Sequence, residues 1–335
     1  KGAWRMTHDP KADDTPTSEM AALMARLASQ DAALPDLMTL DAAAARAQAE
    51  DTNARWNRDL PPMEEARNIT LPATPELGSP ALKARLLRPA KARGLILYLH
   101  GGGWATCNVK THERTMRVLA AESRMAVLGV DYRLAPEFPF PAALHDCVAA
   151  WRAACGMAGD LSAGGPMAVA GDSAGANLAL TLMLFESAAR RRLPDFGLLF
   201  YGVYGDDPTT PSKRAYGDGR FGLSSAKMKR YWEWYVPQDE EHHNPLAAPL
   251  KAEDEALRAL PPLYLNAAGL DPLLSDTLAL ARRLDALGRS DTLFVHRGVV
   301  HGFMQMTIAL AEARAAHERA AEFCRSVSFA NSQGG

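Results

Sequence analysis

The sequence has few cysteines, and their arrangement suggests no structural role. Its 335 residues include four cysteines, which form neither a C-x-x-C pair nor a Cys/His spacing typical of zinc sites. Scattered thiols in a chain of this length are typical of reduced proteins, so we expect a cytoplasmic location and no bound metal. The four are Cys107, Cys147, Cys155 and Cys324.

The sequence also lacks long apolar runs and an excess of charge of either sign. No apolar stretch reaches the ~18 residues that a membrane-spanning helix needs, and residues 1–10 lack the apolar core of a signal peptide. Because the chain starts at Lys1 and not at Met, earlier removal of a leader stays open. The 37 basic and 39 acidic residues leave a net charge of −2, which gives no electrostatic basis for binding nucleic acid. We therefore expect neither a nucleic-acid partner nor a membrane partner.

Hydrophobic residues are present in an ordinary amount, and the first sixty residues carry helical patterns. The hydrophobic share of 47% is enough for a sizeable core. Thr15 and Pro16 are a typical helix start, followed by apolar residues at helical spacing. Asp41 opens a second, alanine-rich helical stretch. The pattern predicts two helices that end before Pro61.

From about residue 82, strand and helix patterns alternate along the chain. Residues 82–88 are predicted to form an edge strand, and the following short apolar runs are typical of buried strands. Those runs are 94–99, 125–130, 167–170, 198–201, 263–266 and 292–296. Helical patterns lie between or after them at 111–122, 142–154, 174–190, 277–287 and 307–325. This alternation predicts an α/β fold with a mostly parallel central sheet flanked by helices.

One long segment interrupts the alternation. Residues 205–236 are rich in glycine, charged and aromatic residues, and they are too long for a simple connection in a compact domain. We expect one or two helices there, around 224–235. Together with the N-terminal helices of residues 1–60, this insertion is predicted to form a helical cap over a core made of residues 61–204 and 237–335.

Residues 171–175 match the pattern G-x-S-x-G, with Ser173 at its centre. The pattern directly follows a predicted strand and precedes a predicted helix, which is the context in which such a serine is lifted out of the sheet as a nucleophile. Glycines are needed because this turn is tight and strained. A chance match in a glycine-rich turn is the alternative, but the flanking strand and helix favour a nucleophilic serine.

A glycine run at the end of the preceding predicted strand complements this serine. Gly101, Gly102 and Gly103 follow His100, and backbone N–H groups in such a loop can stabilise a developing oxyanion. We predict an oxyanion hole from this run, with Gly102 and Gly103 favoured, and from the N–H of Ala174.

A serine nucleophile needs a base, and in this architecture an acid and then a histidine follow the serine along the chain. His301 lies in a loop after the last strand, where α/β enzymes place functional groups. Among the other eight histidines, His296 is predicted to lie inside a strand and His317 on a solvated helix face. Asp271 follows the preceding strand and is the predicted acid. Its competitor, Asp276, is better placed to cap the next helix.

Together, these motifs resemble the bacterial hormone-sensitive-lipase-like branch of the α/β-hydrolases. The resemblance extends from about residue 82 to the end of the chain. It rests on residues 100–103, on DYRLAPE at 131–137, on GDSAG at 171–175, and on 260–262, 271–273 and 301–303. It implies the α/β-hydrolase fold with a helical cap and hydrolysis of carboxylic esters, usually with short acyl chains. It also implies that no cofactor is needed.

The expected function is therefore that of a serine carboxylesterase, with a small-molecule ester as its partner and a homodimer left open. A non-catalytic binding protein of the same fold and an amidase or xenobiotic hydrolase are the alternatives, and the presence of His301 argues against the first. The predicted substrate pocket draws on apolar residues near the motifs and in the insertion. They are Trp104, Tyr201, Phe221, Leu223, Met228 and Leu273.

Overall fold

An eight-stranded, mostly parallel sheet forms the centre of the computed structural model, which describes residues 15–161 and 164–332. The strand order is β1-β2-β4-β3-β5-β6-β7-β8; β1 and β2 pair antiparallel with each other, β2 pairs antiparallel with β4, and the other pairs are parallel. The predicted α/β-hydrolase architecture is confirmed. The strands are β1 (Glu65–Leu71), β2 (Leu82–Arg88), β3 (Leu95–Leu99), β4 (Ala126–Val130), β5 (Met167–Asp172), β6 (Phe196–Phe200), β7 (Leu263–Leu270) and β8 (Thr292–Val300).

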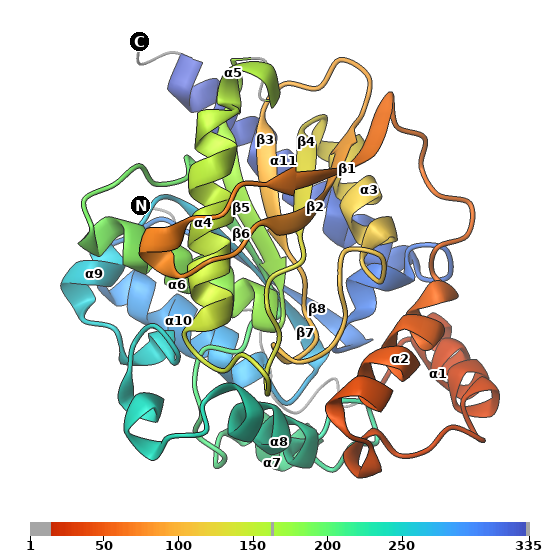
Figure 1. Ribbon diagram of the computed structural model, residues 1–335. Helices are drawn as coiled ribbons and strands as arrows, with labels where there is room; N and C mark the ends of the chain where they lie inside the picture. The colour runs from red at the N-terminus through yellow and green to blue at the C-terminus, as the bar shows by residue number, and fades with distance from the viewer. Residues whose placement is uncertain (1–14, 162–163, 333–335) are drawn as a thin grey trace.

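Helices cover both faces of the sheet (Figure 1). One face carries α3 (Glu113–Ser123) and α11 (Ala311–Ser332), and the other carries α4 (Ala142–Gly156), α6 (Ala174–Ala188) and α10 (Leu274–Ala286). Alternate residues of the central strand β3 belong to opposite layers, because side chains along a strand alternate between faces: Leu97 packs with α4 and α6, whereas Ile96 packs with α3 and α11. This two-sided burial explains why the strands appear in the sequence as nearly continuous apolar runs.

The edge of the sheet differs from the prediction. The edge strand is β1, and β2, which was predicted to be the edge, lies between β1 and β4. Most residues of β1 are exposed, so this strand has no apolar run that could reveal it in the sequence.

Two segments lie together at the end of the sheet where the parallel strands finish (Figure 1). The first contains α1 (Ser18–Gln30), the 3-10 turn η1 (Leu37–Thr39) and α2 (Ala42–Ala54); the second contains α7 (Pro211–Tyr216) and α8 (Ser225–Tyr235). Helix α1 begins two residues later than predicted, because the hydroxyl of Thr17, not that of Thr15, accepts the N–H of Met20 at 3.2 Å. Asp41 caps α2 as predicted, accepting the N–H of Ala44 at 2.8 Å.

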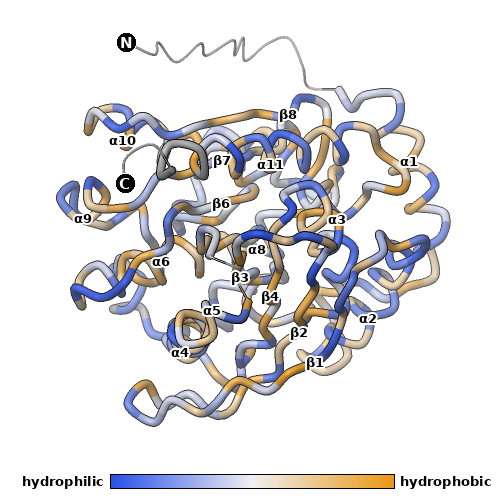
Figure 2. Tube along the Cα trace, turned by 90° about the horizontal axis from the view of Figure 1, so that it is seen from above, coloured by the Kyte–Doolittle hydropathy of each residue, from blue (hydrophilic) through white to orange (hydrophobic). Residues whose placement is uncertain are grey.

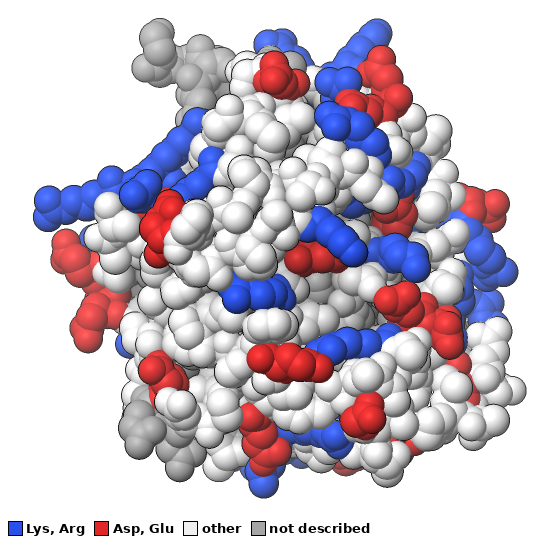
Figure 3. Space-filling view, viewed as in Figure 1, with Lys and Arg blue, Asp and Glu red and all other residues white. Residues whose placement is uncertain are grey.

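The remaining elements are short and connect the layers. They are α5 (Ala158–Leu161), α9 (Asp254–Arg258), η2 (Pro75–Leu77), η3 (Asp239–His243), η4 (Pro249–Lys251) and η5 (Phe303–Met306). Figure 2 shows apolar residues concentrated along the central strands and polar residues at the outer turns. On the face shown in Figure 3, basic and acidic side chains are interspersed, so no large area there carries charge of one sign.

Candidate active site

Ser173 occupies a sharp turn between strand β5 and helix α6. Its backbone has φ 55° and ψ −118°, a strained conformation for a residue with a side chain. The turn is so tight that a Cβ on Gly171 would lie 2.3 Å from the carbonyl oxygen of Gly175, and one on Gly175 would lie 1.9 Å from that of Leu99. Both glycines are therefore required, and the strained turn holds the serine beyond the end of the sheet.

His301 and Asp271 complete a line of hydrogen bonds that begins at this serine. His301 lies just after β8, and its Nε2 is 2.9 Å from Ser173 Oγ. Its Nδ1 is 2.7 Å from Oδ2 of Asp271, which follows β7 and is fully buried. The other oxygen of Asp271 accepts the N–H of Leu273 at 2.8 Å, which fixes the carboxylate. With its Nδ1–H donating to Asp271, the imidazole leaves Nε2 free to accept the serine proton.

Asp276, the alternative acid, has a different role from the predicted helix cap. It lies inside α10, where Oδ2 accepts the N–H groups of Tyr204 and Gly205, both at 2.9 Å. Burial raises the pKa of this carboxyl to about 6, although Lys213, 3.8 Å away, and the two N–H groups lower it. The contacts tie α10 to the start of the inserted segment. The cap prediction was wrong because these partners are distant in the sequence.

The glycine loop after β3 approaches the serine from another side. The N–H of Gly101 donates to Asp172 Oδ1 at 3.0 Å and is therefore already engaged. Gly102 and Gly103 have φ angles of 115° and 58°, which favour glycine. Within the described residues, the N–H groups of Gly102, Gly103 and Ala174 have no hydrogen-bond partner. These three N–H groups are therefore available as donors to an oxyanion. Of the four predicted donors, only Gly101 is not available.

A cavity of about 530 Å³ is lined by His301. One wall of the cavity is formed by α1 and the residues that follow it, and another by residues 219–231. The floor is formed by residues near His301. Of the predicted pocket residues, Phe221 and Leu223 line it. The apolar residues of the cavity are Met20, Met24, Leu27, Ala28, Leu37, Phe221, Leu223, Val300 and Met306, with Tyr231 among them; Asp31, Arg220 and Lys227 are its charged residues.

The other four predicted pocket residues lie elsewhere. Trp104 is buried and stacks on Tyr235, with ring centroids 4.3 Å apart. The ring of Tyr201 packs edge-on against the imidazole of His301, with centroids 4.9 Å apart. Leu273 is buried in the core beside the turn that carries Asp271.

Met228 illustrates why the insertion could not be resolved from the sequence. Helix α8 buries Met228, Trp232 and Tyr235 on one face. Lys227 and Tyr231, one turn apart on a neighbouring face, line the cavity instead. The sequence showed that α8 is amphipathic but not which of its apolar residues turn to the core.

The N-terminal wall of the cavity was missed among the predicted pocket residues. The apolar stripe of α1 was visible in the sequence as a helical pattern, and Met20 and Leu23 are buried. What this stripe packs against depends on where α1 attaches to β8. The attachment is a hydrogen bond from the N–H of Thr17 to the carbonyl of Gly298 at 2.9 Å.

One further expectation about histidines was wrong. His317 is fully buried in α11, not solvated, and its Nε2 lies 3.2 Å from the carbonyl oxygen of Met304. Burial lowers its pKa to about 4, so this imidazole is neutral and plays a structural part.

Among the described residues, no cluster of three or more His, Cys, Asp or Glu side chains is arranged to hold a metal ion. No helix in the described ranges is both long and apolar enough to cross a membrane.

The chain is similar in sequence to known proteins. Residues 96–305 match the family described as alpha/beta hydrolase fold. An AB hydrolase superfamily protein of Schizosaccharomyces pombe is 31% identical over 269 residues, which cover 76% of this chain and 78% of that protein.

Solved structures of esterases resemble the chain over most of its length. An ester hydrolase from the metagenome of Lake Arreo, in complex with a derivative of bipyridine phosphonate, is 32% identical with a TM-score of 0.85, covering 92% of this chain and 98% of that one. A thermostable esterase from Pseudomonas putida is 26% identical with a TM-score of 0.86, over 94% and 98% of the two chains. A hyperthermophilic esterase from the archaeon Pyrobaculum calidifontis is 29% identical with a TM-score of 0.83, over 93% and 98%.

Proposed function

Because the chain belongs to the alpha/beta hydrolase fold family, we propose that it is a serine carboxylesterase acting on short-chain acyl esters through an acyl-enzyme intermediate. The observation that carries this proposal is the unbroken line of hydrogen bonds from Ser173 through His301 to Asp271. Nucleophile, base and orienting acid are in contact in the order that acyl transfer requires.

The reaction follows from the positions of these groups. Ser173 Oγ attacks the ester carbonyl carbon while His301 Nε2 takes the hydroxyl proton, and Asp271 stabilises the resulting imidazolium. The oxyanion lies toward the N–H groups of Gly102, Gly103 and Ala174. Collapse of the tetrahedral intermediate breaks the bond to the alcohol, which takes the proton from His301. Water, deprotonated by the same nitrogen, then attacks the acyl carbon and forms a second tetrahedral intermediate. Its collapse breaks the bond to Ser173 Oγ, which regains a proton from His301, and releases the acid.

The two segments at the end of the sheet are proposed to be the cap, with residues 1–60 and 205–236 as its predicted limits. Helix α1 and residues 219–231 line the cavity mostly with apolar side chains. An apolar wall beside the serine favours short acyl chains, because each additional methylene gains only about 0.8 kcal/mol on burial while a clash with the wall opposes it.

The direct test is a rate profile over p-nitrophenyl esters from acetyl to palmitoyl. We expect the highest kcat/KM between acetyl and hexanoyl, with Ser173→Ala as the inactive control. The matching p-nitroanilides test for amidase activity on the same residues. A phosphonate probe is a suitable label for Ser173, since the Lake Arreo ester hydrolase was solved with a phosphonate derivative. A folded protein without ester hydrolysis and without labelling at Ser173 would refute the proposal.

A further inference from the structure

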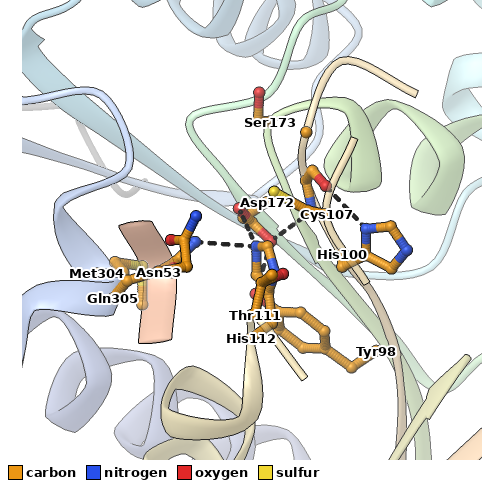
Figure 4. Close-up of polar contacts among 12 residues, drawn as sticks. Asn53, Tyr98, His100, Cys107, Thr111, His112, Asp172, Ser173, Met304 and Gln305 are labelled. Carbon is orange, nitrogen blue, oxygen red and sulfur yellow. Dashed lines mark hydrogen bonds and ion pairs between the residues drawn. The ribbon is translucent and has the colours of Figure 1, made fainter. Parts of the chain in front are cut away.

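A buried polar cluster lies directly beneath the catalytic serine and takes no part in the reaction described above. Its centre is Asp172, the neighbour of Ser173 in the sequence, which is 3% exposed. Figure 4 shows its carboxylate between Ser173 on one side and the side chains of His112 and Tyr98 on the other. Tyr98 Oη donates to Asp172 Oδ1 at 2.8 Å, and the N–H of Gly101 donates to the same oxygen at 3.0 Å.

His112 extends the cluster away from the serine. Its Nε2 is 3.3 Å from Oδ2 of Asp172, and its Nδ1 is 2.9 Å from the hydroxyl of Thr111. That hydroxyl itself donates to the carbonyl of Asn108 at 2.7 Å, so the ring nitrogen is the donor to Thr111. The imidazole is 1% exposed, and both of its nitrogens are engaged.

Gln305 connects the cluster to the loop of the catalytic histidine. It lies in η5, shortly after His301, and its side-chain amide is 3.0 Å from His112 Nε2 (Figure 4). Its Oε1 is buried without a partner among the described residues. An amide can present either its NH2 or its carbonyl oxygen to a ring nitrogen, so Gln305 can pair with His112 Nε2 in either tautomer of the ring.

The carboxylate of Asp172 is ionised at the centre of this cluster. Burial acts to raise the pKa of Asp172, but His112 and the hydrogen bond from Tyr98 outweigh it and hold the pKa below its ordinary value. An ionised acceptor makes stronger hydrogen bonds than a neutral one. The N–H of Gly101 is therefore firmly held, and the peptide that follows it is oriented.

The packing against Asp172 leaves little room for the glycine loop to move. A Cβ on Gly101 would lie 2.5 Å from Asp172 Oδ2. The loop therefore touches the carboxylate both through its N–H and through its Cα. Any shift of Asp172 is passed to Gly102 and Gly103, the proposed oxyanion donors.

We propose that Asp172, His112 and Gln305 are positioning residues that hold the oxyanion loop, the nucleophile turn and the catalytic-histidine loop at a fixed spacing. The proposal rests on the proposed function, because it concerns the geometry of that reaction. None of the three side chains contacts the reacting atoms. They act through Gly101, through the backbone of Ser173 and through the loop of His301.

Three variants test this proposed bridge of Asp172, His112 and Gln305 at different points. Gln305→Met removes the amide at nearly unchanged length. His112→Leu removes both ring nitrogens, whereas His112→Gln keeps an amide that can donate to Asp172. Gln48→Met and His145→Gln are the matched controls, because Gln48 bonds to the carbonyl of Pro35 and His145 lies on α4, away from the catalytic loops.

The expected signature is a loss in kcat with little change in KM. Removing an oxyanion donor outright lowers kcat by about 10²–10³, so we expect a decrease of about 10-fold for Gln305→Met and a larger one for His112→Leu. His112→Gln should recover most of the His112→Leu loss. The inhibition constant of an alkyl trifluoromethyl ketone, whose tetrahedral adduct carries an oxyanion, should rise in parallel with the fall in kcat/KM. Both controls should retain the wild-type values.

The outcome that overturns the proposal is a folded Gln305→Met protein with wild-type kcat and wild-type inhibition by the ketone. Equal loss in His112→Gln and His112→Leu would also contradict it, because the retained donor should matter. If His112→Leu does not fold, Gln305→Met and His112→Gln still decide the question. The rate at which a fluorophosphonate labels Ser173 separates the two proposals: wild-type labelling without ester turnover refutes only the esterase, and equal labelling of wild type and Gln305→Met refutes only the bridge.

Discussion

The proposed catalytic site and the wall of the cavity beside it are held by different kinds of contact. In the site, buried polar groups pair at short distances, as between Ser173, His301 and Asp271. In the wall, apolar side chains of α1 and residues 219–231 face the cavity. Directional hydrogen bonds fix atoms to within a fraction of an ångström, whereas apolar contacts adapt to changes in volume. Chemistry should therefore be sensitive to single atoms of the site, and substrate choice to the volume of the wall.

Two arginine side chains hold the N-terminal and inserted segments in place and have no role in the proposed reaction. Arg46 of α2 donates to the carbonyl oxygens of Ala105 and Ala135, both at 2.8 Å, just behind the glycine loop. Arg230 of α8 donates to carbonyl oxygens of Met38 and Leu40 in and after η1. The N-terminal and inserted segments are thus joined to each other and to the core by contacts with backbone, together with an ion pair of Arg46 with Glu137 at 2.5 Å.

The largest effect is expected from removing the nucleophile or the base. Ser173→Ala and His301→Ala should each lower kcat by a factor on the order of 10⁴–10⁶, and the double variant should be little worse than either. Steady-state kinetics on p-nitrophenyl butyrate, with circular dichroism to check folding, measures this. Additive losses in the double variant would show that the residues do not act as a unit.

Replacing Asp271 or Asp276 should affect different properties, the first the reaction rate and the second the scaffold. Asp271→Asn should lower kcat by about 10⁴, by analogy with serine proteases, because the wrong imidazole tautomer then faces the serine. Asp276→Asn leaves the hydrogen bond between Asp271 and His301 intact and should change kcat far less. The reverse order of damage in the same assay would exclude Asp271 as the orienting acid.

The wall is tested by two apolar residues of the inserted segment. Phe221 lines the cavity, whereas Met228 is buried in the core and does not line it. Phe221→Ala should raise the ratio of kcat/KM for octanoyl over butyryl esters by roughly 10-fold, the value of one to two methylenes at ~0.8 kcal/mol each. Met228→Ala should leave that ratio unchanged and lower the free energy of unfolding by about 2–5 kcal/mol. A Met228→Ala protein with altered chain-length preference would place Met228 in the wall after all.

The smallest expected effect is a pH dependence of stability. It comes from Asp276, where α10 meets the start of the inserted segment. The pKa of Asp276 is raised from 3.8 to about 6, so the folded protein binds this proton more tightly than the unfolded chain does. The folded state therefore loses stability as the pH rises from about 4 to about 6, and the loss is complete above that range. Melting temperatures across this range should fall more for the wild type than for Asp276→Asn. A wild-type melting temperature that rises relative to the variant would contradict the assignment.

Local patterns in the sequence predicted the elements that depend on neighbouring residues. The strand, glycines and helix around Ser173 are contiguous, and the helix start at Asp41 uses a side chain three residues from its partner N–H. Prediction failed where distant partners decide. Asp276 meets Tyr204 and Gly205, and the wall formed by α1 depends on its contact with β8. β1 is held by pairing with β2 and has no hydrophobic pattern of its own.

The contact of α1 with β8 also has a consequence for the order in which the protein becomes functional. Thr17 bonds to Gly298 at 2.9 Å, and the N–H of Ala311 donates to Glu19 at 2.8 Å. During translation α1 leaves the ribosome well before β8, the strand on which it docks. His301 follows directly after β8. The helix therefore cannot dock until β8 has emerged, and a ribosome-bound chain that ends before residue 298 should have neither the α1 wall of the cavity nor His301.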